Sequence, residues 1–134
     1  MKYKHIIWDW NGTLLNDLTL CVDLLNVSLE KRKLPEMTED KYRKKFLFPI
    51  KTFYESIGFD FSKEDFTIAN DEFHQGFEQK FKKLALQPYA QDTIALFQKL
   101  GVTQSILSAT VQSRLEKQVD FFGITHLLLS LIHI

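Results

Sequence analysis

The stretch Ile6-Ile7-Trp8-Asp9-Trp10-Asn11-Gly12-Thr13-Leu14-Leu15-Asn16-Asp17 decides how the rest of the chain is arranged. Its apolar start ends at the carboxylate of Asp9, a Gly-Thr pair follows, and a polar pair then begins a helical pattern. This order predicts a buried strand, a tight loop and the start of a helix. Because ligands of open α/β sheets bind at the carboxyl ends of the strands, we expect Asp9 to lie at a functional site.

The residues of this loop suit phosphate chemistry. A carboxylate at a strand end can attack phosphorus and form an aspartyl phosphate. Carboxylate and phosphate repel each other, so the attack requires a cation, and Mg²⁺ bound by carboxylate and phosphate oxygens supplies it. Gly12 lets backbone N–H groups approach an anion, and Thr13 adds a hydroxyl. The residues alone leave open a simpler interpretation, in which Asp9 ends a strand and Gly12 turns the chain.

The stretch resembles the signature of the haloacid dehalogenase superfamily, an apolar strand followed by D-x-D-G-T-L-x-D. It differs from that signature at Asn11. It matches the signature at Asp9, Gly12, Thr13, Leu14 and Asp17. The resemblance implies an α/β fold, with a Rossmann-like parallel sheet core and an inserted all-helical cap. It is nearest to the phosphoglycolate phosphatase-like branch, which implies Mg²⁺-dependent hydrolysis of a small phosphorylated metabolite.

The resemblance also assigns roles to residues of the loop. Asp9 is implied to be the nucleophile and a metal ligand, and Asn11 to offer its backbone carbonyl to the metal. The family usually has an aspartate in place of Asn11, which protonates the leaving group and later activates water. Asn11 cannot exchange a proton, and general acid–base help is typically worth about 10²–10⁴-fold in rate. Gly12 and Thr13 are implied to contact the substrate.

A second motif follows near the end of the chain. Residues 102–107 are predicted to form a parallel strand, with Ser108 at its carboxyl end. The superfamily places a Ser or Thr there to hydrogen-bond the transferring phosphoryl group, a role that Ser108 fits and for which Thr110 is the alternative. Ala109 stands where relatives often have Asn and is also expected at the substrate. A Ser108 that only caps the next helix remains open from the residues alone.

The remaining pattern predicts the domains. Residues 1–15 and 85–134 are expected to form a partial α/β core, and residues 16–84 a helical cap that closes over Asp9 and chooses the substrate. Within the cap, a helix is expected to begin at Ser62 and to carry a wide aromatic stripe. The apolar end of the chain, residues 124–134, could form a third buried strand. A basic cluster is either a solvated helix face or an attraction for an anionic substrate; its members are Lys41, Arg43, Lys44 and Lys45.

Composition narrows the function classes. The chain has 134 residues, 45% of them hydrophobic, and its 17 basic and 17 acidic residues give a formal net charge of zero. This balance does not favour a nucleic-acid or polybasic membrane role. Cys21 is the single cysteine, so a reducing, cytoplasmic setting is expected. No stretch has the roughly 18 apolar residues of a membrane span.

Two elements that the resemblance implies are not found after Ser108. One is a Lys or Arg that steadies nucleophile and phosphate, and the other is an acidic pair that completes the metal site. We therefore expect a truncated reading frame whose last few residues are not native. The alternative function is a phosphate- and Mg²⁺-binding module that is impaired in turnover, and a helical interaction protein that uses the basic cluster ranks below it. The sequence does not indicate an oligomeric state.

Overall fold

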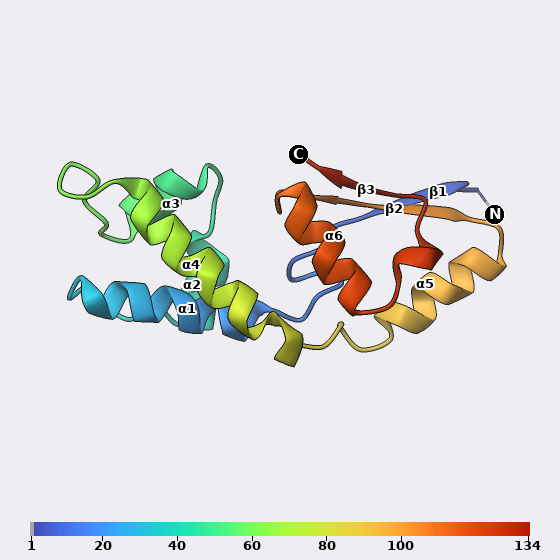
Figure 1. Ribbon diagram of the computed structural model, residues 1–134, viewed down its shortest axis with the longest axis horizontal. Coiled ribbons are helices and arrows are strands. Elements are labelled where there is room, and N and C mark those ends of the chain that lie inside the picture. The colour runs from blue at the N-terminus through green and yellow to red at the C-terminus, as the bar shows by residue number, and fades with distance from the viewer. Residues whose placement is uncertain (1) are drawn as a thin grey trace. The chain divides into compact units, whose positions relative to one another are not determined.

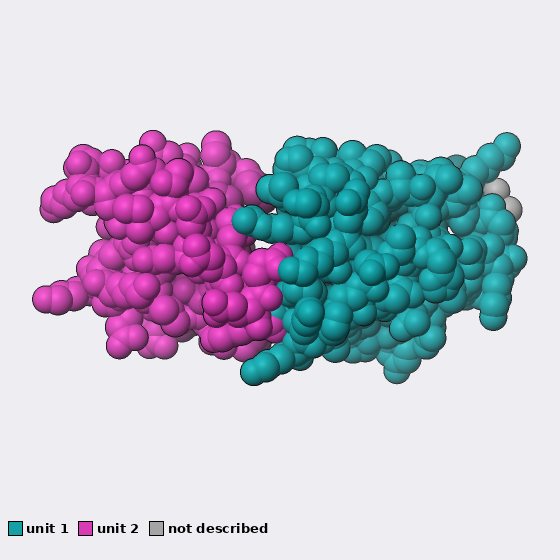
Figure 2. Space-filling view, viewed as in Figure 1, with its two compact units in different colours: residues 1–17, 81–134 teal, residues 18–80 magenta. Residues whose placement is uncertain are grey.

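The computed structural model describes residues 2–134, and the chain forms two compact units (Figure 2). The first, here called the core unit, consists of the residues up to Asp17 together with Phe81–Ile134. The second, the cap unit, is Leu18–Lys80. The sequence pattern placed these breaks at 15/16 and 84/85. No helix among the described residues is long and apolar enough to span a membrane.

The core unit contains a three-stranded parallel sheet in the order β1-β2-β3 (Figure 1). Its strands are β1 (His5–Trp8), β2 (Thr103–Ser108) and β3 (Ser130–His133). Its helices are η1 (Phe81–Lys83), α5 (Ala90–Lys99), α6 (Gln112–Phe121) and η2 (Thr125–Leu127). Strands that alternate with helices in a parallel sheet confirm the predicted α/β, Rossmann-like class, with a partial sheet.

The register of the sheet brings two loops to the same edge. Trp8 in β1 is paired with Ile106 in β2, so β1 ends about where β2 ends at Ser108. Both strands run in the same direction, and the chain therefore leaves both at the carboxyl edge of the sheet. The loops that begin at Asp9 and Ala109 are neighbours for this reason.

The prediction that β1 and β3 are buried strands is wrong for this sheet. Ile7 in β1 is 60% exposed, and β3 contains no fully buried residue. Both strands lie at sheet edges, and α5 and α6 of the core unit lie on the same face of the sheet (Figure 1), so the other face has no helix of the core unit against it. Only β2, between two neighbours, is mostly buried.

The cap unit is entirely helical. Its helices are α1 (Leu18–Lys31), α2 (Glu39–Lys45), α3 (Ile50–Ser56) and α4 (Phe66–Lys80). An apolar cluster forms its core around Phe53, which is 1% exposed. The other buried members are Leu25, Leu29, Met37, Tyr54, Phe59 and Ala69. The Phe53 and Tyr42 rings pack edge-on with centroids 5.7 Å apart, and the Tyr54 and Phe59 rings are stacked.

The start of α4 differs from the sequence prediction. The helix begins at Phe66, not at Ser62. Asp60 accepts hydrogen bonds from the N–H and hydroxyl of Ser62 in a local turn, so Ser62 does not start the helix. Asp65 caps it instead, and its carboxylate accepts the N–H of Thr67 at 2.8 Å. A local side-chain turn therefore competed successfully with helix initiation.

Candidate active site

The loop after β1 is a tight turn organised by one carbonyl group. The backbone oxygen of Trp10 accepts the N–H groups of Thr13, Leu14 and Leu15 at 3.2, 3.0 and 3.0 Å. Gly12 lies inside this turn with φ of +74°, a conformation that costs an L-residue side chain about 1–2 kcal/mol. Nothing lies within 4 Å of the position that a Cβ would take there. The glycine is thus required by the backbone conformation and not by crowding.

Asp9 is exposed at the start of this turn, directly after β1. One carboxylate oxygen, Oδ1, accepts the N–H of Trp10 at 2.8 Å. The other, Oδ2, accepts the hydroxyl of Thr13 at 3.2 Å. These two hydrogen bonds orient the carboxylate while it stays accessible to solvent, which is the arrangement that an attacking nucleophile requires.

Asn11 links the first loop to the loop after β2. Its Nδ2 donates to Oδ2 of Asp17 at 2.8 Å, and its Oδ1 accepts the hydroxyl of Thr110 at 2.8 Å. Asp17 is only 2% exposed. The Asn11 side chain is therefore held at both ends, and its neutral amide can both donate to the Asp17 carboxylate and accept from Thr110.

Ser108 and Thr110 make different contacts in the loop after β2. Ser108 is 2% exposed, and its Oγ accepts the N–H of Thr110 at 3.1 Å. The bond is a local turn contact and not the helix cap considered from the sequence, because the N-cap of α6 is Val111. Thr110, the alternative residue, is the one whose hydroxyl reaches Asn11 in the first loop. Ala109, between them, is exposed. The roles of Ser108, Ala109 and Thr110 toward a substrate stay predictions.

The donor set suits a hard cation that retains several waters. Asp9 offers a carboxylate, and the backbone carbonyl of Asn11 is two residues further along the same turn. Mg²⁺ is commonly bound through one or two carboxylates plus waters and phosphate oxygens. Among residues 2–134, no group of three or more His, Cys, Asp or Glu side chains is arranged to hold a metal. The protein ligands that fit Mg²⁺ here are thus few and belong to one loop.

Comparison with known proteins identifies the family. The sequence profile of haloacid dehalogenase-like hydrolases matches residues 6–133, nearly the whole chain. The chain belongs to this family. The loop after β1 carries the signature residues of the family except at position 11, where Asn11 stands. Among curated proteins, no sequence matches the chain significantly.

Solved structures share the family fold. A predicted phosphoglycolate phosphatase from Haemophilus somnus 129PT is 19% identical with a TM-score of 0.81, covering 99% of this chain and 63% of that one. A putative haloacid dehalogenase-like hydrolase from Bacteroides fragilis is 15% identical with a TM-score of 0.84, covering 98% and 63%. A predicted phosphatase from Clostridium acetobutylicum is 17% identical with a TM-score of 0.79, covering 98% and 61%. The chain therefore spans less than two thirds of the length of these relatives. At sequence identities this low, the structural similarity shows a shared fold.

The Lys and Arg side chains that follow Ser108 in the sequence lie on α6. Arg114 and Lys117 both belong to that helix, and the Lys117 Nζ lies 5.9 Å from the centroid of the Phe81 ring. Glu116, also on α6, accepts a hydrogen bond from Gln112 at 2.8 Å. These side chains belong to a helix and not to a strand end, as the sequence indicated.

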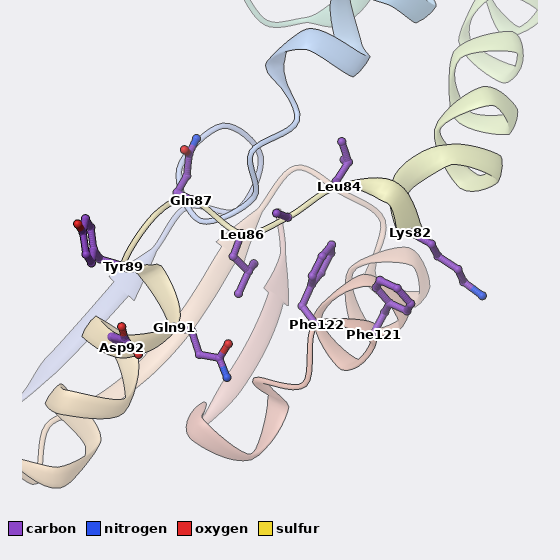
Figure 3. A pocket seen from close by; sticks show the side chains of 10 residues that line it. Lys82, Leu84, Leu86, Gln87, Tyr89, Gln91, Asp92, Phe121 and Phe122 are labelled. Atoms are coloured by element: carbon purple, nitrogen blue, oxygen red, sulfur yellow. The ribbon is translucent and has the colours of Figure 1, made fainter.

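A separate groove of about 560 Å³ lies in the core unit (Figure 3). It is lined by the segment after η1, the start of α5 and the end of α6, with Lys82, Asp92 and Phe121 among its side chains. Neither Asp9 nor Asn11 lines it. The groove is therefore not the phosphate site expected from the family signature, and the loop after β1 remains the candidate active site.

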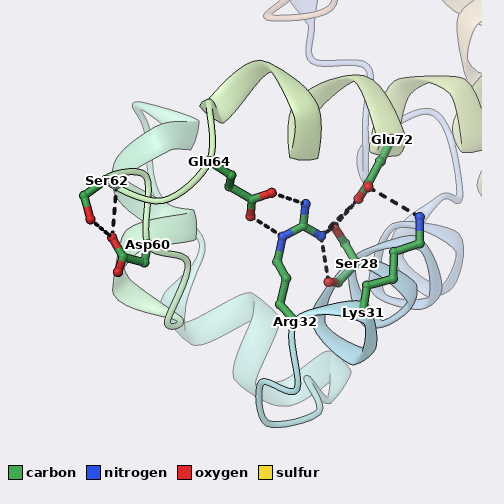
Figure 4. A network of polar contacts seen from close by, with 7 residues as sticks. All are labelled: Ser28, Lys31, Arg32, Asp60, Ser62, Glu64 and Glu72. Atoms are coloured by element: carbon green, nitrogen blue, oxygen red, sulfur yellow. Dashed lines mark hydrogen bonds and ion pairs between the residues drawn. The ribbon is translucent and has the colours of Figure 1, made fainter.

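The strongest electrostatic cluster lies in the cap unit and surrounds Arg32 (Figure 4). Its guanidinium binds both carboxylate oxygens of Glu64, with Nη2 to Oε2 at 2.9 Å. Its Nη1 contacts Glu72 at 3.1 Å and the Ser28 hydroxyl at 2.7 Å. The bond to Glu64 contributes most to raising the pKa of Arg32 above its usual value. This cluster ties α1 and the residue after it to α4 and to the segment that precedes α4.

The sequence did not single out one buried polar residue near the candidate site. Gln118 on α6 is 2% exposed and accepts the indole N–H of Trp10 at 2.9 Å. The spacing of the helix could have indicated it. An inward helix face has the spacing i, i+3, i+4, i+7, which is followed here by Leu115, Gln118, Val119 and Phe122. A polar side chain on such a face requires a buried partner.

Proposed function

We propose that this protein is a Mg²⁺-dependent phosphatase that hydrolyses a small, phosphoglycolate-like phosphorylated metabolite through an aspartyl phosphate on Asp9. The observation that carries the proposal is the exposed Asp9 carboxylate at the carboxyl end of β1, oriented by the Trp10 N–H and the Thr13 hydroxyl. Family membership and the phosphatase names of two solved relatives support the reaction class.

In the first step, an Asp9 oxygen attacks phosphorus, and the bond from phosphorus to the ester oxygen breaks with its electron pair on that oxygen. The Asp9 carboxylate and the Asn11 carbonyl would hold Mg²⁺, which when bound would neutralise charge between carboxylate and phosphate. The N–H groups of Gly12, Thr13, Leu14 and Leu15 donate to carbonyls within the turn, and so they fix the shape of the loop beside Asp9. In the second step, water attacks phosphorus, the Asp9 carboxylate is released and phosphate departs.

Asn11 limits both steps. Its amide carries no titratable proton, so the leaving oxygen must depart without help from residue 11, and the attacking water finds no base there. Esters with good leaving groups therefore react best. The aspartyl phosphate is expected to form faster than it hydrolyses and to accumulate.

The test uses p-nitrophenyl phosphate with and without Mg²⁺. We expect a Mg²⁺-dependent burst of p-nitrophenol, together with a gain of one phosphoryl group in the mass of the intact protein. Asp9→Asn should abolish both signals, because the nucleophile is lost. Asp120→Asn is the matched control, since it removes an exposed carboxylate on α6. Release of p-nitrophenol that persists in Asp9→Asn contradicts the proposal.

A second candidate function, phosphate and Mg²⁺ binding without turnover, is favoured by the fixed Asn11 side chain between Asp17 and Thr110. The same experiment separates the two. Inorganic phosphate with Mg²⁺ would then raise the melting temperature of the wild-type protein, and p-nitrophenyl phosphate would release no p-nitrophenol. If neither the ion nor phosphate changes the melting temperature, the binding function fails as well.

A further inference from the structure

Trp10 is one of three buried residues of the turn after β1, with Leu14 and Leu15. It is 0% exposed, whereas its neighbours Asp9 and Asn11 are exposed. Its ring packs against Phe122, with centroids 6.1 Å apart and planes tilted by 59°. Its indole N–H donates to the Oε1 of Gln118 on α6, and this buried bond joins residues 108 positions apart in the sequence.

The backbone of Trp10 determines the geometry of the candidate site. Its N–H binds Oδ1 of Asp9, and its carbonyl accepts three N–H groups of the turn. A rotation or shift of Trp10 therefore moves the nucleophile and the turn together. Apolar packing against Phe122 holds the ring but is not directional, whereas a hydrogen bond prefers one angle and one distance.

We propose that Gln118 is a positioning residue of the candidate active site, which acts through the Trp10 indole to hold the Asp9 carboxylate and the phosphate-facing turn in place. Its catalytic consequence rests on the proposed phosphatase function. A misplacement of about 1 Å can cost roughly 100-fold in rate, so one lost bond at this point has a large effect without any contact to substrate.

The chain contains a matched bond that does not involve the turn. The indole N–H of Trp8, within β1, donates to the Oε1 of Gln104 at 3.0 Å. Gln104 is 1% exposed and also donates to the carbonyl of Ile94 at 2.8 Å. Both bonds join a tryptophan indole to a buried glutamine in the core unit, but the Trp8 bond connects a strand already held by its sheet neighbour.

The experiment compares Gln118→Met with Gln104→Met by amide hydrogen exchange and by kinetics. In Gln118→Met, we expect exchange at Thr13, Leu14 and Leu15 to become at least about 10-fold faster, because their common acceptor is the Trp10 carbonyl. We also expect kcat for p-nitrophenyl phosphate to fall about 10-fold with KM within about twofold. Gln104→Met should change neither quantity, although it loses two hydrogen bonds.

A double variant separates positioning from stability. Trp10→Phe combined with Gln118→Met removes donor and acceptor together, so no buried polar group is left without a partner. We expect it to recover much of the thermal stability that Gln118→Met loses, while exchange at the three amides stays fast. Recovery of slow exchange in the double variant would overturn the proposal.

Three further outcomes complete the test. Equal exchange at the three amides in Gln118→Met and Gln104→Met shows that the Gln118 bond does not position the turn and overturns the proposal. If the wild-type protein releases no p-nitrophenol, the proposed phosphatase function fails, but the exchange comparison still tests Gln118. If Gln118→Met does not fold, the double variant provides the exchange measurement.

Discussion

The core unit and the cap unit each use buried or half-buried polar contacts to join segments distant in the sequence, but with different chemistry. In the core unit, neutral glutamines accept the indole N–H groups of Trp8 and Trp10. In the cap unit, the charged Arg32 binds the carboxylates of Glu64 and Glu72. The difference shows that the two tryptophan indoles of the core unit are held by bonds whose strength does not depend on ionisation.

The Gln118 amide holds Trp10 without adding a charge next to Asp9. In the cap unit, Arg32 is 15% exposed and has two carboxylate partners, so its charge is compensated locally. The two units should consequently respond differently to substitution and to pH.

The largest effect on stability is expected from Arg32→Met. The substitution leaves Glu64 and Glu72 without their main partner, and hydrogen bonds to charged groups are worth about 1.5–3 kcal/mol. We expect a loss of about 2–3 kcal/mol in the free energy of unfolding, measured by urea denaturation. Lys31→Met is the control: Lys31 contacts the same Glu72 at 3.4 Å but is 57% exposed, so its loss should stay below about 0.5 kcal/mol. Equal losses in the two variants would show that the Arg32 network adds nothing beyond surface pairing.

A smaller effect on stability, but a specific one on function, is expected from Gly12→Ala. Gly12 and Gly101 have φ of +74° and +75°, and nothing lies within 4 Å of a Cβ at either position. Each Gly→Ala substitution should therefore cost a similar amount, about 1 kcal/mol, in the free energy of unfolding. Only Gly12→Ala should reduce phosphoryl transfer to Asp9, measured as the p-nitrophenol burst. A burst reduced to the same extent in Gly101→Ala would mean that stability, and not the loop, controls the reaction.

The smallest effect is expected from pH and belongs to the cap unit. Burial opposes ionisation of Glu72, but hydrogen bonds from Ser28 and Arg32 outweigh it and keep the pKa of Glu72 below its ordinary value. Unfolded Glu72 therefore binds a proton at higher pH than folded Glu72. The stability that it contributes is complete above its unfolded pKa of about 4.3 and is lost as pH falls through the lower folded pKa.

The measurement is the difference in unfolding free energy between wild type and Glu72→Gln across pH 7 to 3. We expect the wild type to be more stable at pH 7 and the difference to shrink as the pH falls. A difference that stays constant or grows toward acidic pH contradicts the lowered pKa of Glu72. The Trp10–Gln118 bond has no titrating partner, so Gln118→Met should show a pH-independent difference from wild type over the same range.

Local sequence was informative wherever neighbouring residues determine the conformation. The apolar run before Asp9, the glycine in the turn and the strand ending at Ser108 were all readable from order and spacing, and they led to the α/β fold. The start of α4 could not be read in this way, because Ser62 and Asp65 both have side chains able to cap a helix. Only the bond from Ser62 to Asp60 decided between them.

Burial of the strands could not be read from composition alone. The runs around β1 and β3 are apolar enough for interior strands, yet Ile7 and Ile132 are 60% and 42% exposed. Exposure depends on how many strands and helices surround a segment, and hydrophobic pattern does not report that number. The contact between Asn11 and Thr110 could not be read from the sequence either, because the two residues lie 99 positions apart.

The sequence by itself determined the family, the parallel α/β core with its helical insertion, and the loop that carries Asp9, because strands, turns and signature motifs depend on residues close together in the chain. The tertiary structure alone decided that the Asn11 side chain accepts a hydrogen bond from Thr110 and that Trp10 is tied to Gln118. Side-chain hydrogen bonds depend on distances of about 3 Å between groups brought together by folding, and no local pattern specifies them.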